Sequence, residues 1–545
     1  MKINKIVLMM LGGALLATSC NDLNEQEFEG GTLSTVRLQE SNSADTKKAN
    51  ATFEGMFSYL GTPCSTFGTS QGRADDFGMV MACISLDLEG ADMAMGDNGY
   101  NWFSTASELS SRNADYANPY IRYVTPYREI GIANQVIASV PANTTNKTLL
   151  YNSAQAHAII AYDYLMLAPY YQFAYDEAAD QPCVPIIADS LDAASNPRAT
   201  VRQVYQIIKD NLDYAVENLA GYNRGGDKQK IDQHVAYALR ARVNLYMGNY
   251  ADAAADAEKA LEGYTPATRA EVSEPGFDDI SAHNWIWGID ITPDQAAIMG
   301  YATAASWIGA FSGDGYAPAT DNVPVINKLL YDKIPSTDIR KSWWLDENKH
   351  SDAWANLSWG DAKGDAIADL VLDGVKNAYL PYMSIKFGQK AGVGSTDNSN
   401  DFPLIRVEEM ILTRAEGLLK SGNEPQARQV LEDFVKNYRD PSYSANGRGL
   451  SLADEIWFQR RVELWGEGFF TADMKRLHKP LVRFHGEGTT NFPDAFVFNV
   501  AANDGWLNMR FPTSEMDNNP AIVDNQGGAL PVAGQNPDLR DGVTD

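Results

Sequence analysis

Aromatic side chains in polar, irregular stretches are the residues of this chain whose chemistry stands out most. The sequence has 11 Trp and 26 Tyr, and many of them fall outside any helical periodicity. An aromatic ring offers flat apolar area and a π surface at low entropic cost, which suits the C–H face of a sugar ring. We expect one group to form an exposed platform, although filling of the core is the alternative for any single ring. The candidate ligand-binding residues are Trp102, Trp307, Trp343 and Trp344, supported by Tyr100 and Tyr316.

Paired carboxylates suggest a second chemistry, because two acids suffice for glycoside hydrolysis. Glu463 and Glu467 lie about one helical turn apart and share a face. Arg460 precedes them on the same segment, so we expect both acids to be buried as ion pairs against Arg460 or Arg461. The preferred interpretation is therefore a protein with no catalytic residues, and a surface glycoside hydrolase using this pair is the main alternative.

The other chemical motifs are weaker. Asp87, Glu89, Asp92 and Asp97 could hold calcium through oxygen ligands, but their spacing does not match an EF-hand loop. Residues 68–72 fit a GxSxG motif without the flanking strand and oxyanion loop that such a nucleophile needs. The sequence contains no zinc spacing, P-loop or dinucleotide fingerprint. We expect no cofactor and no metal, with assistance by calcium left open.

The N-terminus carries the pattern of a bacterial lipoprotein signal. Lys2 and Lys5 precede an apolar run over residues 6–16, which is too short to span a bilayer permanently. Small residues then lead to Cys20, the expected site of acylation, so we expect a chain anchored by lipid rather than spanning the membrane. The pattern predicts a location outside the cytoplasm, on the outer membrane and facing the cell exterior.

Charge and cysteine content narrow the function classes. The formal net charge is −27, which argues against nucleic acid and polyanionic ligands and favours neutral ones such as uncharged glycans. Four cysteines are present, so acylation of Cys20 leaves Cys64, Cys83 and Cys183 as an odd set. A pair between Cys64 and Cys83 is conceivable, but buried free thiols are the favoured state.

Helical periodicity dominates the chain on either side of a long irregular region. We expect a signal peptide over 1–19, an acylated flexible tether over 20–48 and one domain over 49–545. Within that domain we expect a helical scaffold over 49–263 and 401–480, a loop-rich insertion forming the ligand face over 264–400, and an irregular segment over 481–545. Small residues around the turns at 248–250 and 421–423 are typical of tetratricopeptide hairpins, and 285–289 alternates like a strand. The expected helices are 120–140, 154–170, 201–219, 234–247, 251–261 and the hairpin 411–431, with one short helical run inside the insertion near 325–331.

Several stretches, taken in order behind the lipoprotein signal, resemble the SusD/RagB family of outer-membrane nutrient-binding lipoproteins of Bacteroidetes. Gln459 stands where many members have Glu, and the aromatic pair Phe469-Phe470 replaces an arginine, but both positions look structural. The matching stretches are 156–168, 184–187, the repeat around Gly248, 403–416, 459–468 with Asp473, Lys475 and Arg476, and 510–526.

The resemblance implies a mainly α fold in which four tetratricopeptide-like helical hairpins form the scaffold, with minor β-strands and a loop-rich ligand face. It further implies capture of a neutral oligosaccharide or polysaccharide and its delivery to a SusC-like TonB-dependent transporter. The family's ligand residues do not form a fixed motif, so none is transferred to this chain. Capture of peptides, or binding of a protein partner alone, is the remaining alternative.

Overall fold

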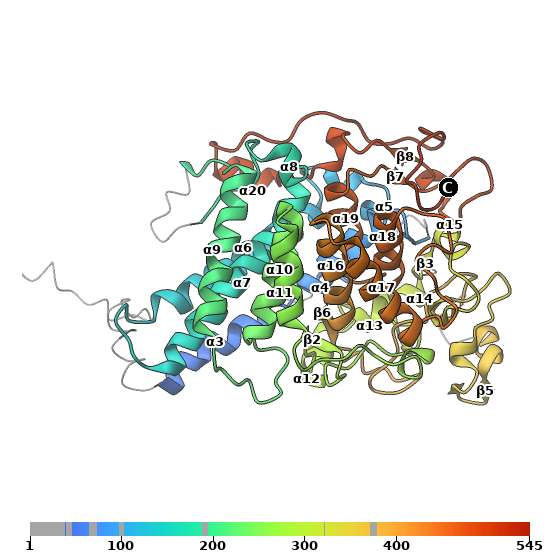
Figure 1. The fold of residues 1–545 in the computed structure, drawn as a ribbon, viewed down its shortest axis with the longest axis horizontal. Coiled ribbons are helices and arrows are strands. Elements are labelled where there is room, and N and C mark those ends of the chain that lie inside the picture. Colours follow the sequence, from blue (N-terminus) through green and yellow to red (C-terminus); the bar gives the residue numbers. More distant parts are fainter. Residues whose placement is uncertain are drawn as a thin grey trace, which may run out of the picture.

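The chain folds into two regions that pack side by side, a helical array and a loop-rich region (Figure 1). The computed structural model describes Gln39 and residues 46–64, 73–96, 103–187, 195–320, 322–370 and 379–545. The predicted signal peptide, Cys20 and nearly all of the predicted tether therefore lie outside the described residues. In the described part of the chain, no helix combines the length and apolar composition needed to cross a bilayer.

Long helices pack against one another in chain order to form the array. Each successive pair is in contact, from α6 to α7, α9, α10, α11, α16 and α17, and in Figure 1 they run from the left into the centre. The two hairpins predicted from the small residues at 248–250 and 421–423 are present as the pairs α10–α11 and α16–α17, so that prediction is confirmed. The members are α6 (Ala117–Ala138), α7 (Lys147–Tyr171), α9 (Val201–Asn218), α10 (Gln233–Met247), α11 (Tyr250–Ala260), α16 (Val407–Lys420) and α17 (Glu424–Tyr438).

Local sequence signals set where these helices begin, turn and cross. Thr200 forms a capping box with Gln203 at the start of α9, which satisfies two backbone N–H groups that the helix leaves unpaired. Gly248 ends α10 in the left-handed region at φ 78°, where a side chain would be strained. A Cβ at Gly417 would lie 2.6 Å from the Tyr250 carbonyl oxygen, so only glycine lets α16 approach α11 this closely.

Shorter elements complete the fold. The strand predicted at 285–289 is present as β2 (Trp285–Ile289) and pairs antiparallel with β6 (Phe402–Arg406), so it joins the two ends of the loop-rich region. The predicted helical run at 325–331 instead divides into a strand and one helical turn. The other strands are β1 (Met93–Ala94) with β3 (Val325–Ile326), β4 (Ser358–Trp359) with β5 (Ala362–Lys363), and β7 (Leu481–Val482) with β8 (Asn499–Val500). The other helices are α3 (Thr46–Tyr59), α4 (Met79–Leu88), α5 (Ser104–Ser107), α8 (Tyr175–Ala178), α12 (Pro293–Met299), α13 (Ala304–Trp307), α14 (Tyr316–Ala319), α15 (Lys328–Tyr331), α18 (Leu452–Glu463), α19 (Phe470–Arg476) and α20 (Thr513–Asn518).

The helical array buries two acids without a cation. Glu129 on α6 and Asp163 on α7 are both fully buried, and none of their four carboxylate oxygens has a hydrogen-bond donor among the described residues. Burial raises the pKa of both carboxyls well above the ordinary value, and the charge of Glu129 raises the pKa of Asp163 further. Burial therefore favours the protonated, uncharged form of the pair.

The three described cysteines are buried, and no disulfide joins one of them to another, as the sequence favours. Burial raises the pKa of both Cys83 and Cys183 to about 12, so these thiols remain protonated at neutral pH. The described part of the fold is therefore held by packing and polar contacts rather than by disulfides.

Candidate aromatic ligand site

Four aromatic rings form a series that runs from the core to the surface of the loop-rich region. Phe103 meets Trp307 edge-on with ring centroids 4.6 Å apart, and Trp307 lies 4.8 Å from Tyr316. Tyr316 in turn contacts Tyr301 edge-on at 5.9 Å. We call these four residues the aromatic ladder.

Short helices and side-chain hydrogen bonds fix the ladder in place. Thr303 caps α13, which carries Trp307 at its end, by accepting a hydrogen bond from the Ser306 backbone N–H. The Ser306 hydroxyl accepts a hydrogen bond of 2.8 Å from the backbone N–H of Tyr316, the first residue of α14. The Trp307 indole donates to the Ala74 carbonyl at 2.6 Å. The Trp307 ring and the backbone of Tyr316 therefore have set positions before any ligand arrives, which lowers the entropic cost of binding.

Exposure along the ladder rises from its base to its tip. Trp307 has no exposed surface, Tyr316 is half-buried, and Tyr301 exposes 49% of its surface beside Ile298, which exposes 87%. Trp307 is thus the buried support of the ladder rather than a contact surface, because Phe103 and Tyr316 cover its ring. Tyr301 was missed from the sequence, although its place next to Gly300 between two short helices was an available signal.

Two of the predicted ligand residues cannot be placed. Tyr100 and Trp102 lie outside the described residues, but Phe103, which follows Trp102 in the sequence, packs against Trp307. Phe103 and the stretch 301–316 therefore meet at one place, although about 200 positions separate them in the sequence.

The prediction of a ligand platform is wrong for Trp343 and Trp344. Only 1% of Trp343 and none of Trp344 is exposed. The Trp343 indole donates to the Val272 carbonyl at 2.9 Å, and Trp344 packs edge-on against Trp465 at 5.5 Å. The physical reason is that these indoles fill a hydrophobic core that the insertion shares with the helical array.

A hollow of about 190 Å³ lies beside Trp344. Its wall includes Tyr331, Lys341, Asp346 and His350. The Lys341 ammonium donates to the Ile334 carbonyl at 2.9 Å and stands over the Tyr331 ring, 4.6 Å from its centroid. These contacts order the loop itself, and the hollow lacks the exposed aromatic surface that the ladder offers.

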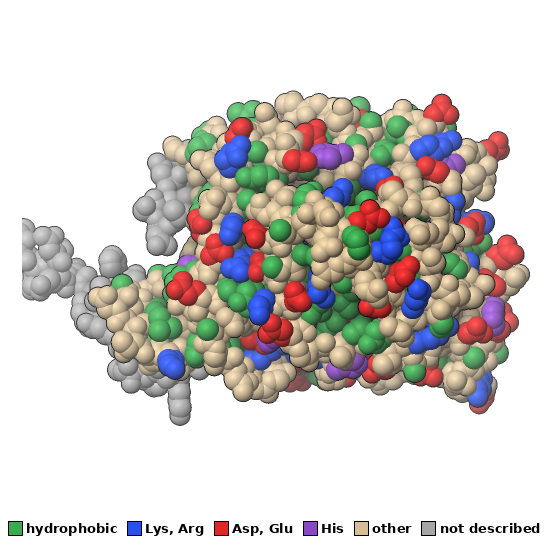
Figure 2. All heavy atoms as spheres, viewed as in Figure 1, with side chains coloured by type: hydrophobic (Ala, Val, Ile, Leu, Met, Phe, Trp, Pro, Cys, Tyr) green, Lys and Arg blue, Asp and Glu red, His purple; other side chains and the backbone are tan. Residues whose placement is uncertain are grey.

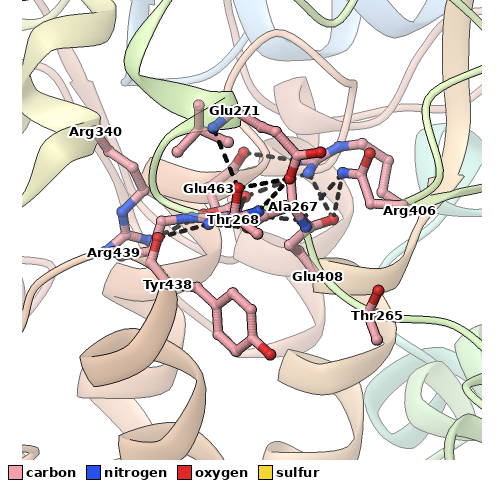
Figure 3. Close-up of polar contacts among 12 residues, drawn as sticks. Thr265, Ala267, Thr268, Glu271, Arg340, Arg406, Glu408, Tyr438, Arg439 and Glu463 are labelled. Carbon is pink, nitrogen blue, oxygen red and sulfur yellow. Dashed lines mark hydrogen bonds and ion pairs between the residues drawn. The ribbon is translucent and has the colours of Figure 1, made fainter.

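Glu463 and Glu467 belong to a buried network of charges rather than to a cleft. Glu463 accepts hydrogen bonds from Arg439 at 2.8 Å and Arg340 at 3.3 Å (Figure 3), and Glu467 accepts from Lys386 and Arg406, both at 2.7 Å. Burial alone would raise the pKa of Glu467, but the cations Arg406 and Lys386 hold it below its ordinary value. Neither acid can donate a proton to a ligand or reach one, so the hydrolase alternative loses its carboxylate pair.

The predicted partners of these two acids are also wrong. Arg460 pairs instead with Asp473 at 2.7 Å, and Arg461 pairs with Asp92 and Asp541, both at 2.6 Å. The reason is that the cations facing Glu463 come from distant segments of the chain, which helical spacing cannot reveal.

The acids considered for calcium have separate protein partners. Asp87 accepts the backbone N–H of Gly466 at 2.7 Å, Glu89 pairs with Arg112 and Arg122, and Asp92 pairs with Arg461. Asp97 and the GxSxG motif at 68–72 lie outside the described residues. Within the described ranges, no group of three or more His, Cys, Asp or Glu side chains is placed to hold a metal ion.

Two family models match the chain. Residues 293–527 match the SusD family, and residues 84–245 match a family described as starch-binding and associating with the outer membrane. A search of curated proteins found no significant match.

Solved structures from Bacteroides share the fold. A SusD-like carbohydrate binding protein from Bacteroides vulgatus is 23% identical with a TM-score of 0.67, over 88% of this chain and 97% of that one. A putative sugar binding protein from the same organism is 21% identical with a TM-score of 0.67, over 89% and 99%. Surface glycan-binding protein A from Bacteroides uniformis is 15% identical with a TM-score of 0.63, over 88% and 99%.

Proposed function

Because the chain belongs to the SusD/RagB family, we propose that it captures a neutral glycan at the outer membrane without catalysing a reaction. The observation that carries this proposal is the aromatic ladder, which presents fixed rings at the surface of the loop-rich region. Tyr301 and Tyr316 are the described residues that contact the sugar, and Trp307 supports them from below. Tyr100 and Trp102 extend the same surface in this proposal.

Capture occurs by stacking of sugar rings on these aromatic faces together with hydrogen bonds to hydroxyl groups. A single sugar buries little area, so each site is weak, with a Kd on the order of micromolar to millimolar. A longer glycan gains affinity by engaging neighbouring rings at once. Weak individual contacts also allow release, which a protein that delivers its ligand requires.

Lipid attachment at Cys20 holds the protein at the outer surface of the outer membrane, from which it delivers the glycan to a SusC-like TonB-dependent transporter. Support for this part comes from the lipoprotein pattern before Cys20 and from the match to a family associating with the outer membrane. The acidic residues that follow Cys20 suit a solvated tether.

The experiment uses the soluble chain from residue 21 onward, with a panel of neutral and charged glycans. Retention is measured by isothermal titration calorimetry, and release of reducing ends is measured on the same samples. Binding without release supports capture and identifies the ligand. Release of reducing ends contradicts the non-catalytic role, and no binding at all favours a peptide or protein ligand.

A further inference from the structure

The chain segments that build the aromatic ladder contain no basic residue. Residues 74–111, 284–327 and 391–405 contain no Lys, Arg or His, although they contain several Asp and Glu residues. Over the helical array, by contrast, acidic and basic side chains are interspersed on the face shown in Figure 2. These segments therefore supply no cation to neutralise a carboxylate or sulfate on a ligand, and Arg73, which directly precedes Ala74, pairs with Asp75 at 2.8 Å.

One acid in these segments, Asp314, is held in a fixed orientation two residues before Tyr316. Its Oδ1 atom accepts a hydrogen bond from the Asn398 amide at 3.1 Å. Asn398 and Ser312 are themselves buried; the Ser312 hydroxyl lies 3.3 Å from the same Oδ1 and donates its hydrogen to the nearer Asn398 Oδ1 at 2.7 Å. Asp314 is half-buried, and its Oδ2 has no partner among the described residues.

Backbone pairing fixes the turn that carries Asp314. The Gly313 N–H donates to the Ser395 carbonyl, and the Gly394 N–H donates to the Phe311 carbonyl, both at 2.8 Å. A Cβ at Gly313 would lie 2.4 Å from the Gly394 carbonyl oxygen, so the two segments touch at their backbones. The turn cannot move away from α14 without breaking these contacts, and Asp314 stays beside the ladder.

We propose that Asp314 is a specificity-determining residue that accepts hydrogen bonds from the hydroxyl groups of a neutral glycan stacked on the ladder. A carboxylate oriented by a buried donor on one oxygen offers its other oxygen to a sugar hydroxyl, and such charge-assisted bonds are stronger than neutral ones. The same carboxylate, with no cation beside it, repels uronate and sulfate groups. This inference rests on the proposed function and adds the residue that selects the neutral ligand.

The test compares the wild-type protein with Asp314→Asn by calorimetry. The neutral probes are maltohexaose, cellohexaose, xylohexaose and mannohexaose, and the anionic probes are hexagalacturonate and a hyaluronan hexasaccharide. We expect Asp314→Asn to weaken binding of the neutral probe by about tenfold or more, since an amide oxygen accepts more weakly than a carboxylate. The wild type should bind neither anionic probe.

Controls separate this inference from the proposed function. Asp538→Asn, at an exposed position of the C-terminal segment, should leave both affinity and Tm unchanged. Asp314→Glu keeps the charge and should bind more tightly than Asp314→Asn, which a purely structural role would not predict. Unchanged affinity in Asp314→Asn overturns this inference while leaving the proposed function intact. Tight binding of hexagalacturonate by the wild type overturns this inference together with the neutral ligand class of the proposed function. If the wild type binds no glycan, the proposed function fails and the inference fails with it.

Discussion

Replacing Glu129 by Gln should make the protein more stable at neutral and alkaline pH, the opposite of the usual effect of a core substitution. Glu129 on α6 and Asp163 on α7 interact with each other and have no paired cation among the described residues, while Tyr59, Tyr162 and Tyr164 are titratable groups that interact with the pair. Gln has nearly the shape of Glu, carries no charge, and can donate an amide hydrogen to Asp163.

The magnitude follows from the protons that the folded pair retains. Both carboxyls have a raised pKa, so their favourable contribution is complete below the unfolded pKa values of about 4 and is lost as the pH rises towards the folded values. Each proton that only the folded state retains lowers the free energy of unfolding by about 1.4 kcal/mol per pH unit above the unfolded pKa, or by up to about 4 kcal/mol at pH 7. Burial of the amide offsets part of this gain. We therefore expect Glu129→Gln to raise the free energy of unfolding by about 1–3 kcal/mol at pH 7–8 and to leave it unchanged near pH 4.

The assay is urea and thermal unfolding of the wild type and Glu129→Gln between pH 4.5 and 8.5. The matched control is Glu217→Gln, at an exposed position on α9, which should change neither stability nor its dependence on pH. Asp163→Asn should reproduce the gain, and the two substitutions should not be additive because they act on one pair. Destabilisation by Glu129→Gln at pH 8, or a pH dependence identical to that of the wild type, would refute the reasoning.

Three further predictions concern the ladder and the buried indoles and charges. Tyr301→Ala should weaken glycan binding about tenfold in calorimetry with little change in Tm, because the ring is exposed; a large fall in Tm would show that it is structural. Trp343→Ala should lower the free energy of unfolding in urea by about 3–5 kcal/mol and leave the affinity of the remaining folded protein unchanged. Loss of affinity without loss of stability would instead show that Trp343 contacts the ligand. Glu463→Gln should destabilise by about 3–5 kcal/mol at pH 7, because Arg340, Arg406 and Arg439 lose a buried counter-charge. The pKa of Glu463 is lowered in the folded state, so its contribution to the free energy of unfolding is complete above about pH 4.3 and declines only as the pH falls towards the folded pKa. Equal unfolding curves for mutant and wild type at pH 7 would contradict this prediction.

Local patterns were sufficient to predict most of the helical array. The periodicity over 201–219 and the turn at Gly248 depend on neighbouring residues, and α9 and α10 end within a residue or two of the predicted positions. The strand at 285–289 is likewise a local pattern, and it was predicted correctly. The run at 325–331 was not, because pairing of Val325 and Ile326 with a strand more than two hundred residues earlier decides its structure.

Burial of single aromatic residues could not be predicted in the same way. Trp307, Trp343 and Tyr301 all lie in irregular sequence, and only contacts with distant segments determine which ring is covered. The partners of Glu463 show the same limit, since Arg340 and Arg439 lie far from it in the chain. The location of the ladder was predicted from clustering of aromatic residues, whereas the order of exposure along it required the tertiary structure.

The three buried thiols allow local unfolding of this protein to be measured through their accessibility to reagents. Cys64 follows α3, Cys83 lies on α4 and Cys183 follows α8, so the three buried sulfur atoms lie in different parts of the fold. A maleimide or iodoacetamide reagent reaches a given sulfur only when the helices over it separate, so the rate of alkylation at each cysteine measures the free energy of that local opening. Mass spectrometry of the three peptides would then give a map of which hairpins loosen first, without adding any label to the chain.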